Sequence, residues 1–140
     1  MVVKVKKLDP SAVVPKKAHA DDAGFDLVAV SAGFENGRWV CHTGLAFEIP
    51  EGYVGLVFPR SSIVKKDMDM ANSVGVVDSN YRGEVTARFR LTGTLEFPKY
   101  AAGERCCQII IIPYPEVEFE EAEELSNTDR GHGGYGSTGA

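Results

Sequence analysis

The chain of 140 residues is long enough for one domain with a hydrophobic core, and its 44% hydrophobic and 25% charged residues are ordinary for a globular protein. The net charge of -5 excludes a general attraction to nucleic acid or to an anionic membrane, so any phosphate-binding site has to be local. No run approaches about 18 apolar residues, and the first residues lack a signal-peptide core, which predicts a cytoplasmic protein.

The cysteines and histidines give no sign of a disulfide framework or a zinc site. Cys41, Cys106 and Cys107 are odd in number and two are adjacent, which favours reduced thiols in an intracellular compartment. No Cys or His spacing fits zinc. The three histidines are predicted to be surface residues: His19, His42 and His132.

The first half of the chain alternates short β runs with turns. A strand is predicted at 3–8, ended by Asp9-Pro10, and the next apolar run covers 23–30. Further strands are predicted at 39–42, 45–49 and 53–58, with a turn at 50–52. The only helical candidate is short and lies around 61–66.

The second half continues the same pattern. Residues 72–83 predict a β-hairpin, because two apolar runs flank a turn rich in Ser, Asn and Gly. Residues 84–91 alternate polar and apolar, which predicts a strand with one buried face. Residues 108–112 predict a central strand covered on both sides, and 117–120 a late edge strand. Many short strands at this spacing indicate an all-β sandwich or barrel.

The last residues, 130–140, are rich in glycine and cannot hold a structure of their own. The stretch Gly131-His-Gly-Gly-Tyr-Gly136 matches G-x-G-x-x-G, but no helix follows to receive a pyrophosphate, so a dinucleotide-binding loop is excluded. Composition alone favours a disordered terminus, although an arginine, an aromatic ring and two hydroxyls among glycines would also suit a flap over a ligand.

Three further segments carry side chains suited to ligand binding. At 58–62, Arg60 and the following serines could form an anion site, or the serines could cap a helical turn. In the 72–83 segment, the Asn72 amide could read a base edge, and Asp78 could act chemically or simply stabilise the turn. Gln108, a lone amide before four isoleucines, requires a partner or a ligand, whereas Glu104 and Arg105 are expected to form ion pairs.

Together these segments resemble the five motifs of the trimeric dUTP pyrophosphatases (dUTPases), in the same order and with matching spacing. The segments are Ala-Gly-Phe-Asp-Leu at 23–27, Pro-Arg-Ser-Ser at 59–62, Val-Val-Asp-Ser-Asn-Tyr-Arg-Gly at 76–83, Gly-Glu-Arg-Cys-Cys-Gln at 103–108 and Arg-Gly-His-Gly-Gly-Tyr-Gly-Ser-Thr-Gly at 130–139. The resemblance spans nearly the whole chain.

The resemblance implies a jelly-roll subunit at 1–128 and a flexible C-terminal arm at 129–140, assembled as a homotrimer with active sites at subunit interfaces. It implies Mg²⁺-dependent hydrolysis of dUTP to dUMP and pyrophosphate by water attack on the α-phosphorus. The metal would be held mainly by the triphosphate. The reaction would supply dUMP for thymidylate synthesis and keep uracil out of DNA.

The resemblance also implies roles for individual residues. Asp78 would hold and polarise the attacking water, since a carboxylate is a weak base at neutral pH. Asp26 would reach the metal only through water, or else support the subunit core. The phosphates would be bound by Arg60, Ser61, Ser62, Gln108, Arg130, Ser137 and Thr138, the last three at the γ end.

The base and sugar would be bound by the hairpin and the arm. Tyr81 would pack on the deoxyribose and leave no room for a 2′-hydroxyl, and Tyr135 would stack over uracil. The uracil edge would be read by Asn72 and the backbone near Gly75, Val76 and Val77, with Thr86 on the opposite strand.

Two residues depart from the family pattern: Tyr135 replaces the usual Phe, and Asn80 stands where an Asp is common. Two alternatives stay open. One is a related dCTP deaminase, or a bifunctional version of it. The other is a non-enzymatic trimer whose nucleotide state governs a partner protein.

Overall fold

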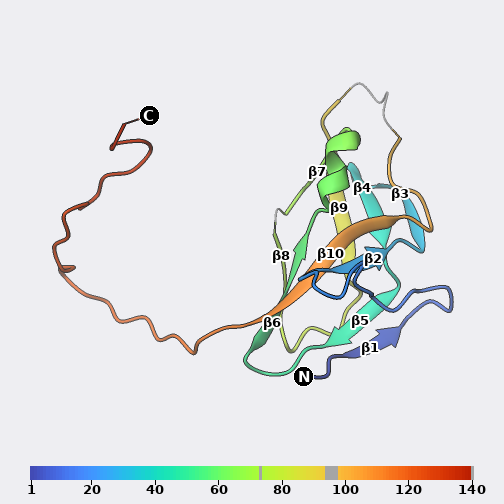
Figure 1. The fold of residues 1–140 in the computed structure, drawn as a ribbon, viewed down its shortest axis with the longest axis horizontal. Coiled ribbons are helices and arrows are strands. Elements are labelled where there is room, and N and C mark those ends of the chain that lie inside the picture. Colours follow the sequence, from blue (N-terminus) through green and yellow to red (C-terminus); the bar gives the residue numbers. More distant parts are fainter. Residues whose placement is uncertain (73, 94–97, 140) are drawn as a thin grey trace.

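A computed structural model describes residues 1–72, 74–93 and 98–139. These residues form short β-strands and one 3-10 helix (Figure 1). The elements are β1 (Lys4–Lys7), β2 (Phe25–Val28), β3 (Ser31–Glu35), β4 (Arg38–His42), β5 (Leu45–Glu48), β6 (Tyr53–Phe58), η1 (Ser61–Lys65), β7 (Met68–Met70), β8 (Gly75–Val77), β9 (Thr86–Leu91) and β10 (Arg105–Pro113). The predicted all-β class is confirmed, and the short helical turn falls at η1 as expected.

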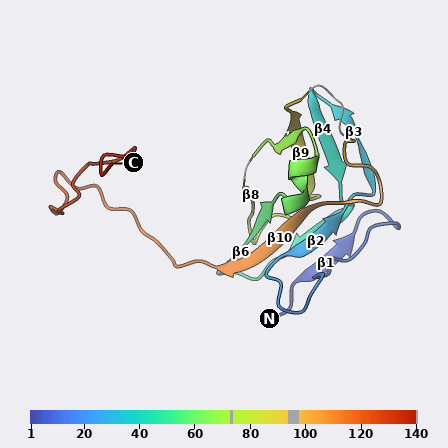
Figure 2. The ribbon, with the colours of Figure 1, turned by 45° about the horizontal axis from the view of Figure 1, so that its top comes forward.

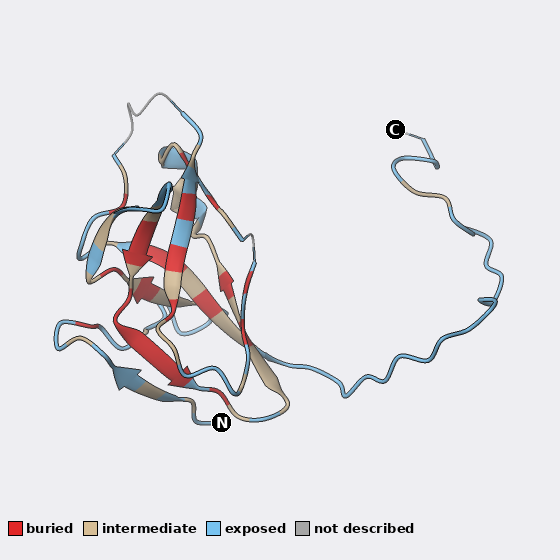
Figure 3. Cartoon of the chain, turned by 180° about the vertical axis from the view of Figure 1, so that it is seen from behind, coloured by how far each residue is buried: buried red, intermediate tan, exposed pale blue. Residues whose placement is uncertain are grey.

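Two four-stranded antiparallel sheets form the body of the molecule, in the orders β2-β10-β6-β8 and β3-β4-β9-β7, and β1 pairs separately with β5. Buried side chains from both sheets make one core, as a sandwich of two half-buried sheets requires (Figure 3). In β9 the alternation predicted from the sequence is present, since Ala87 and Phe89 are buried while Arg88 and Arg90 are exposed. The jelly-roll subunit is confirmed.

Strand β10 lies at the centre of its sheet, between β2 and β6, as predicted. Its inner face is buried at Ile109, but Ile112 on the other face is 38% exposed. The prediction that both faces are covered is therefore wrong for the single chain.

The segment between β8 and β9 crosses from one sheet to the other. Strand β8 pairs with β6, whereas β9 pairs with β4 and β7. The predicted β-hairpin at 72–83 is therefore wrong, although a tight turn exists in which the Tyr81 N–H donates to the Asp78 carbonyl at 3.1 Å. Turn residues show that a chain reverses locally, but they do not show which strands pair afterwards.

Beyond β10 the chain leaves the sandwich. The Tyr114 N–H still donates to the Gly52 carbonyl at 3.0 Å, and residues 115–139 then run away from the body as an exposed segment (Figures 1 and 2). The predicted strand at 117–120 is wrong, because those residues form no ladder with another strand and Phe119 is 94% exposed. Within the described residues no helix has the length and apolarity needed to cross a membrane.

Candidate active site

A cavity of about 160 Å³, called here the β8 pocket, lies beside the edge strand β8. It gathers every residue of the subunit body that was predicted to bind uracil or deoxyribose. Its lining consists of Val57, Met70, Asn72, Gly75, Val76, Val77, Tyr81, Glu84, Val85 and Thr86. The crossing from β8 to β9 explains this clustering, because it wraps the chain around one small space.

Gly75 allows the Asn72 amide to pack against the β8 backbone. A Cβ at Gly75 would lie 3.2 Å from Asn72 Nδ2 and 3.3 Å from Val57 Cβ, closer than most real contacts. A larger residue at this position would displace the Asn72 amide. The Asn72 amide therefore lies against the β8 backbone. The amide and this backbone are the two groups that were predicted to bind the uracil edge together.

The Tyr81 ring folds back over its own turn. Its hydroxyl donates to the Glu84 carbonyl at 3.0 Å, and a Cβ at Gly83 would overlap that hydroxyl. Glycine at 83 is thus required for this ring position. Asp78, the predicted catalytic residue, is exposed and directly follows the pocket residue Val77.

The predicted phosphate-binding residues of the body form a second group, around Asp26 on β2. Arg60 donates from Nε to Asp26 Oδ1 at 2.7 Å and from Nη1 to Ser62 Oγ at 3.2 Å. Arg105 Nη1 donates to Asp26 Oδ2 at 3.0 Å, so both carboxylate oxygens have a guanidinium partner. Ser61 is exposed in η1 beside this group.

Gln108 joins the second group through the backbone. Its Nε2 donates to the Pro59 carbonyl at 3.0 Å, which supplies the partner that its position required. A Cβ at Gly24 would overlap Gln108 Oε1, so Gly24 leaves room for the amide. The expected ion pairs of Glu104 and Arg105 are confirmed, with Lys66 and Asp26 respectively.

The residues of the Asp26 group do not line the β8 pocket. The arm residues lie apart from both: Arg130 Nε donates locally to the Gly133 carbonyl at 3.0 Å, and Tyr135 is fully exposed. Ser137 and Thr138 are exposed as well.

Replacing Asp26 with alanine is expected to destabilise the protein, because Arg60 and Arg105 would lose their shared counter-charge in a partly buried site. We expect a loss of about 1–3 kcal/mol in the free energy of unfolding, measured by urea denaturation. Asp69→Ala, on the exposed face of β7, is the matched control and should change stability by less than about 0.5 kcal/mol. Equal losses in the two variants would contradict this reading of Asp26.

The sequence did not indicate four lining residues of the β8 pocket, namely Val57, Met70, Glu84 and Val85, nor the contact that His42 makes with Glu84. The prediction of a surface histidine holds for His19 and His132, which are exposed, but it is wrong for His42. The His42 side chain is 30% exposed and lies between the carboxylates of Glu35 and Glu84. These contacts join residues far apart in the sequence, so no local pattern indicates them.

The described residues contain no cluster of three or more His, Cys, Asp or Glu side chains suited to holding a metal ion. Asp26, the one residue considered for a metal role, already has both oxygens paired with arginines.

Comparison with known proteins identifies the family. The model of the dUTPase family matches residues 11–139, which is nearly the whole chain. The chain belongs to the dUTPase family. The resemblance drawn from the five motifs is thereby confirmed.

Relatives and solved structures agree with this assignment. The chain is 41% identical over 145 residues to the deoxyuridine 5′-triphosphate nucleotidohydrolase of Hydrogenobaculum, covering 99% of each, and 38% identical over 140 residues to that of Corynebacterium glutamicum, covering 98% of this chain and 94% of the relative. A dUTPase of Staphylococcus bacteriophage 80alpha, a G164S mutant solved with dUpNHpp, superposes with a TM-score of 0.85 at 27% identity and covers 99% of both chains.

Proposed function

We propose that this dUTPase-family protein hydrolyses dUTP to dUMP and pyrophosphate. The observation that carries the proposal is the β8 pocket, which brings Asn72, the β8 backbone and Tyr81 together around one cavity. The relatives are named for the same reaction, and the phage enzyme was solved with dUpNHpp.

The pocket suits a deoxyuridine nucleoside. Among the described residues, β8 pairs with β6 alone, so its outer edge presents backbone N–H and C=O groups that can bond the edge of a base. The Asn72 amide adds a donor and an acceptor beside them. The Tyr81 ring would pack on the deoxyribose and exclude a 2′-hydroxyl.

We propose a homotrimer whose active sites form between subunits. The residues of the Asp26 group do not line the β8 pocket, and the described part of the arm runs away from the body, which supports a site completed by more than one copy. Residues 1–128 would form the jelly-roll body and 129–140 the arm. In the complete site Tyr135 would cover the base, while Arg130, Ser137 and Thr138 would hold the γ end of the triphosphate.

The chemistry would use few protein groups. Asp78 would orient and polarise a water molecule, which adds to the α-phosphorus while the bond from that phosphorus to the α–β bridging oxygen breaks and pyrophosphate leaves. Arg60, with the hydroxyls of Ser61 and Ser62 and the Gln108 amide, would bind the phosphates. Mg²⁺ would enter as part of the nucleotide and neutralise triphosphate charge, and Asp26 would serve mainly to hold Arg60 in place.

We further propose a cytoplasmic location and a role in supplying dUMP and keeping uracil out of DNA. Its three cysteines are free and buried, as expected for a reducing compartment.

Pyrophosphate release from dUTP, dTTP, dCTP and UTP in the presence of magnesium tests the proposal. We expect efficient cleavage of dUTP alone, because the pocket reads the uracil edge and the Tyr81 ring excludes ribose. Conversion of dCTP to dUTP or dUMP would instead support the deaminase alternative. Tight binding of dUTP without any pyrophosphate release would support a non-enzymatic nucleotide sensor.

A further inference from the structure

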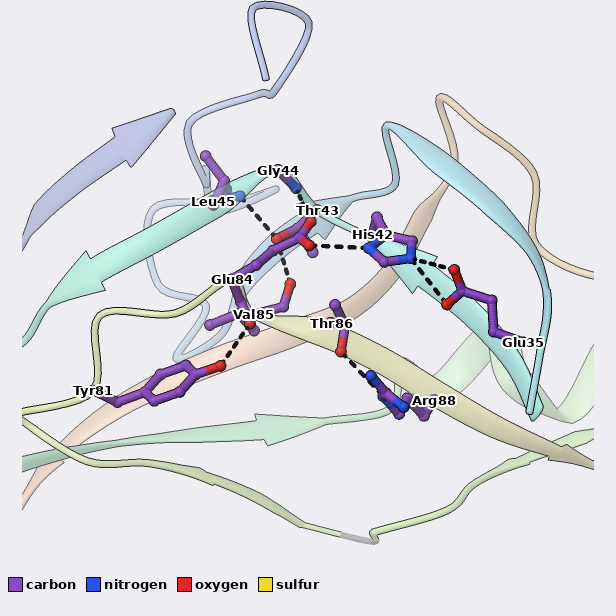
Figure 4. A network of polar contacts seen from close by, with 10 residues as sticks. All are labelled: Glu35, His42, Thr43, Gly44, Leu45, Tyr81, Glu84, Val85, Thr86 and Arg88. Carbon is purple, nitrogen blue, oxygen red and sulfur yellow. Dashed lines mark hydrogen bonds and ion pairs between the residues drawn. The ribbon is translucent and has the colours of Figure 1, made fainter. Parts of the chain in front are cut away.

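Two side-chain hydrogen bonds tie the crossing segment before β9 to the corner between β4 and β5, as Figure 4 shows. The Thr43 hydroxyl is fully buried, donates to the Val85 carbonyl at 2.6 Å and accepts from the Leu45 N–H at 3.2 Å. The Gly44 N–H donates to Glu84 Oε1 at 2.8 Å. These bonds hold the Val85 carbonyl and one oxygen of the Glu84 carboxylate.

Glu84 is the connection between this corner and the β8 pocket. Glu84 is a lining residue of the pocket, its carboxylate accepts from the Gly44 N–H, and its carbonyl accepts from the Tyr81 hydroxyl at 3.0 Å. The position of the Tyr81 ring therefore depends on where Glu84 is held. In Figure 4 the Tyr81 ring and the His42 ring lie on opposite sides of Glu84.

His42 holds the second oxygen of that carboxylate. Its Nδ1 lies 2.9 Å from Glu84 Oε2, and its Nε2 lies 3.0 and 3.1 Å from the two oxygens of Glu35 (Figure 4). Both ring nitrogens thus face carboxylates. Only the imidazolium has an N–H on each nitrogen, so only the charged form can donate to both partners at once.

We propose that His42 is a positioning residue for the sugar side of the β8 pocket: its imidazolium bridges Glu35 and Glu84, and through Glu84 it fixes the Tyr81 ring that discriminates deoxyribose from ribose. The proposal rests on the proposed function for its kinetic readouts. When His42 loses a proton as the pH rises, one of its ring nitrogens becomes an acceptor that faces a carboxylate. Glu35 and Glu84 then no longer share a cation.

The electrostatic surroundings favour the charged form. The pKa of His42 is raised above its ordinary value of 6.5, first by the hydrogen bond with Glu84 and further by Glu35, while partial burial opposes the shift. Among the described residues, the charged groups within hydrogen-bonding distance of the ring are Glu35 on β3 and Glu84 in the segment before β9. Arg88 on β9 donates to Thr86 Oγ1 at 3.4 Å. Because the pKa is raised, the bridge is complete below about pH 6.5 and is lost as the pH rises through the higher folded pKa.

The test compares the wild-type protein with His42→Gln from about pH 5.5 to about pH 9. Glutamine is neutral at every pH, so the ratio of the two KM values for dUTP cancels the titration of the nucleotide phosphates. We expect His42→Gln to raise KM about five- to tenfold at low pH, with kcat changed less than about twofold, and the KM ratio to approach one at high pH. In His42→Gln at low pH, the ratio of kcat/KM for dUTP to kcat/KM for UTP should fall by a similar factor. The corresponding ratio for dUTP and dTTP should not change.

Two further variants make the test specific. His19→Gln removes a histidine that is 84% exposed beside Asp22, and it should leave the KM profile unchanged. Glu35→Gln removes one carboxylate that raises the His42 pKa, and it should move the transition of KM to lower pH. This second variant keeps the proposal testable if His42→Gln fails to fold.

A KM ratio that is one at every pH, or that does not vary with pH, would overturn the proposal while wild-type cleavage of dUTP continues. If the wild-type protein does not cleave dUTP, the proposed function fails instead. The positioning role can then be tested by NMR without substrate. We expect the chemical shifts of the Tyr81 ring to change as His42 titrates. Tyr81 chemical shifts that stay constant through this titration would overturn the proposal.

Discussion

Replacing Asp78 with asparagine is expected to leave dUTP binding intact and to remove nearly all turnover. The side chain is exposed at the end of β8, next to the β8 pocket but outside its lining, so binding of the base and sugar does not depend on its charge. Loss of a group that orients and polarises water costs about 10²- to 10⁴-fold in kcat. Steady-state kinetics and the dissociation constant of dUpNHpp would measure the two effects separately.

Asp69→Asn is the matched control for Asp78. It makes the same change at an exposed aspartate, on β7, where the neighbouring residues Met68 and Met70 are buried and Asp69 points outward. This variant should retain the wild-type kcat. An Asp78→Asn protein with wild-type turnover would remove the catalytic role, and one that no longer binds dUpNHpp would show that Asp78 serves binding instead.

Deletion of residues 130–140 is expected to leave a folded trimer with little activity. In the described part of the arm, the Gly131 N–H donates to Thr128 just before the arm, and the other backbone hydrogen bonds of residues 130–139 are formed within the arm, so the sandwich loses no contact. The free energy of unfolding should change by less than about 0.5 kcal/mol. In contrast, kcat/KM should fall about 100-fold or more, because the nucleotide would be neither enclosed nor held at its γ end.

Two controls separate the chemistry of the arm from its length. Tyr135→Phe keeps the ring and should retain most activity, whereas a Gly-Ser arm of the original length should behave like the deletion. Size-exclusion chromatography with light scattering would report the assembly. Unfolding or dissociation into monomers on truncation would show that the arm is structural.

The sequence predicted strands correctly where a local pattern of polar and apolar residues determines them. It was less successful where strand formation depends on pairing with another strand. The alternation in β9 reports its buried face, but the same kind of alternation at 117–120 forms no strand, because no neighbouring strand accepts its hydrogen bonds there. The β3–β4 hairpin was missed although Asn36-Gly37 signals it. Both residues have positive φ, 47° and 74°, as the tight turn between two strands requires.

In the candidate site, too, contacts between residues close in the sequence were predictable, whereas contacts made by strand pairing were not. Asn72, Gly75 and Tyr81 lie close together in the sequence, so a motif could predict that they share a pocket. His42 and Glu84 are 42 residues apart and meet only because β4 pairs with β9. Sequence patterns carry no information on such a contact until the sheet order is known.

The central claim is that a water molecule, oriented by Asp78, attacks the α-phosphorus of dUTP bound in the β8 pocket. The most direct measurement is the position of the label after hydrolysis of dUTP in H₂¹⁸O with magnesium. We expect ¹⁸O in dUMP and none in pyrophosphate, at a rate that Asp78→Asn abolishes. Label in pyrophosphate, or release of dUDP and phosphate, would contradict the account.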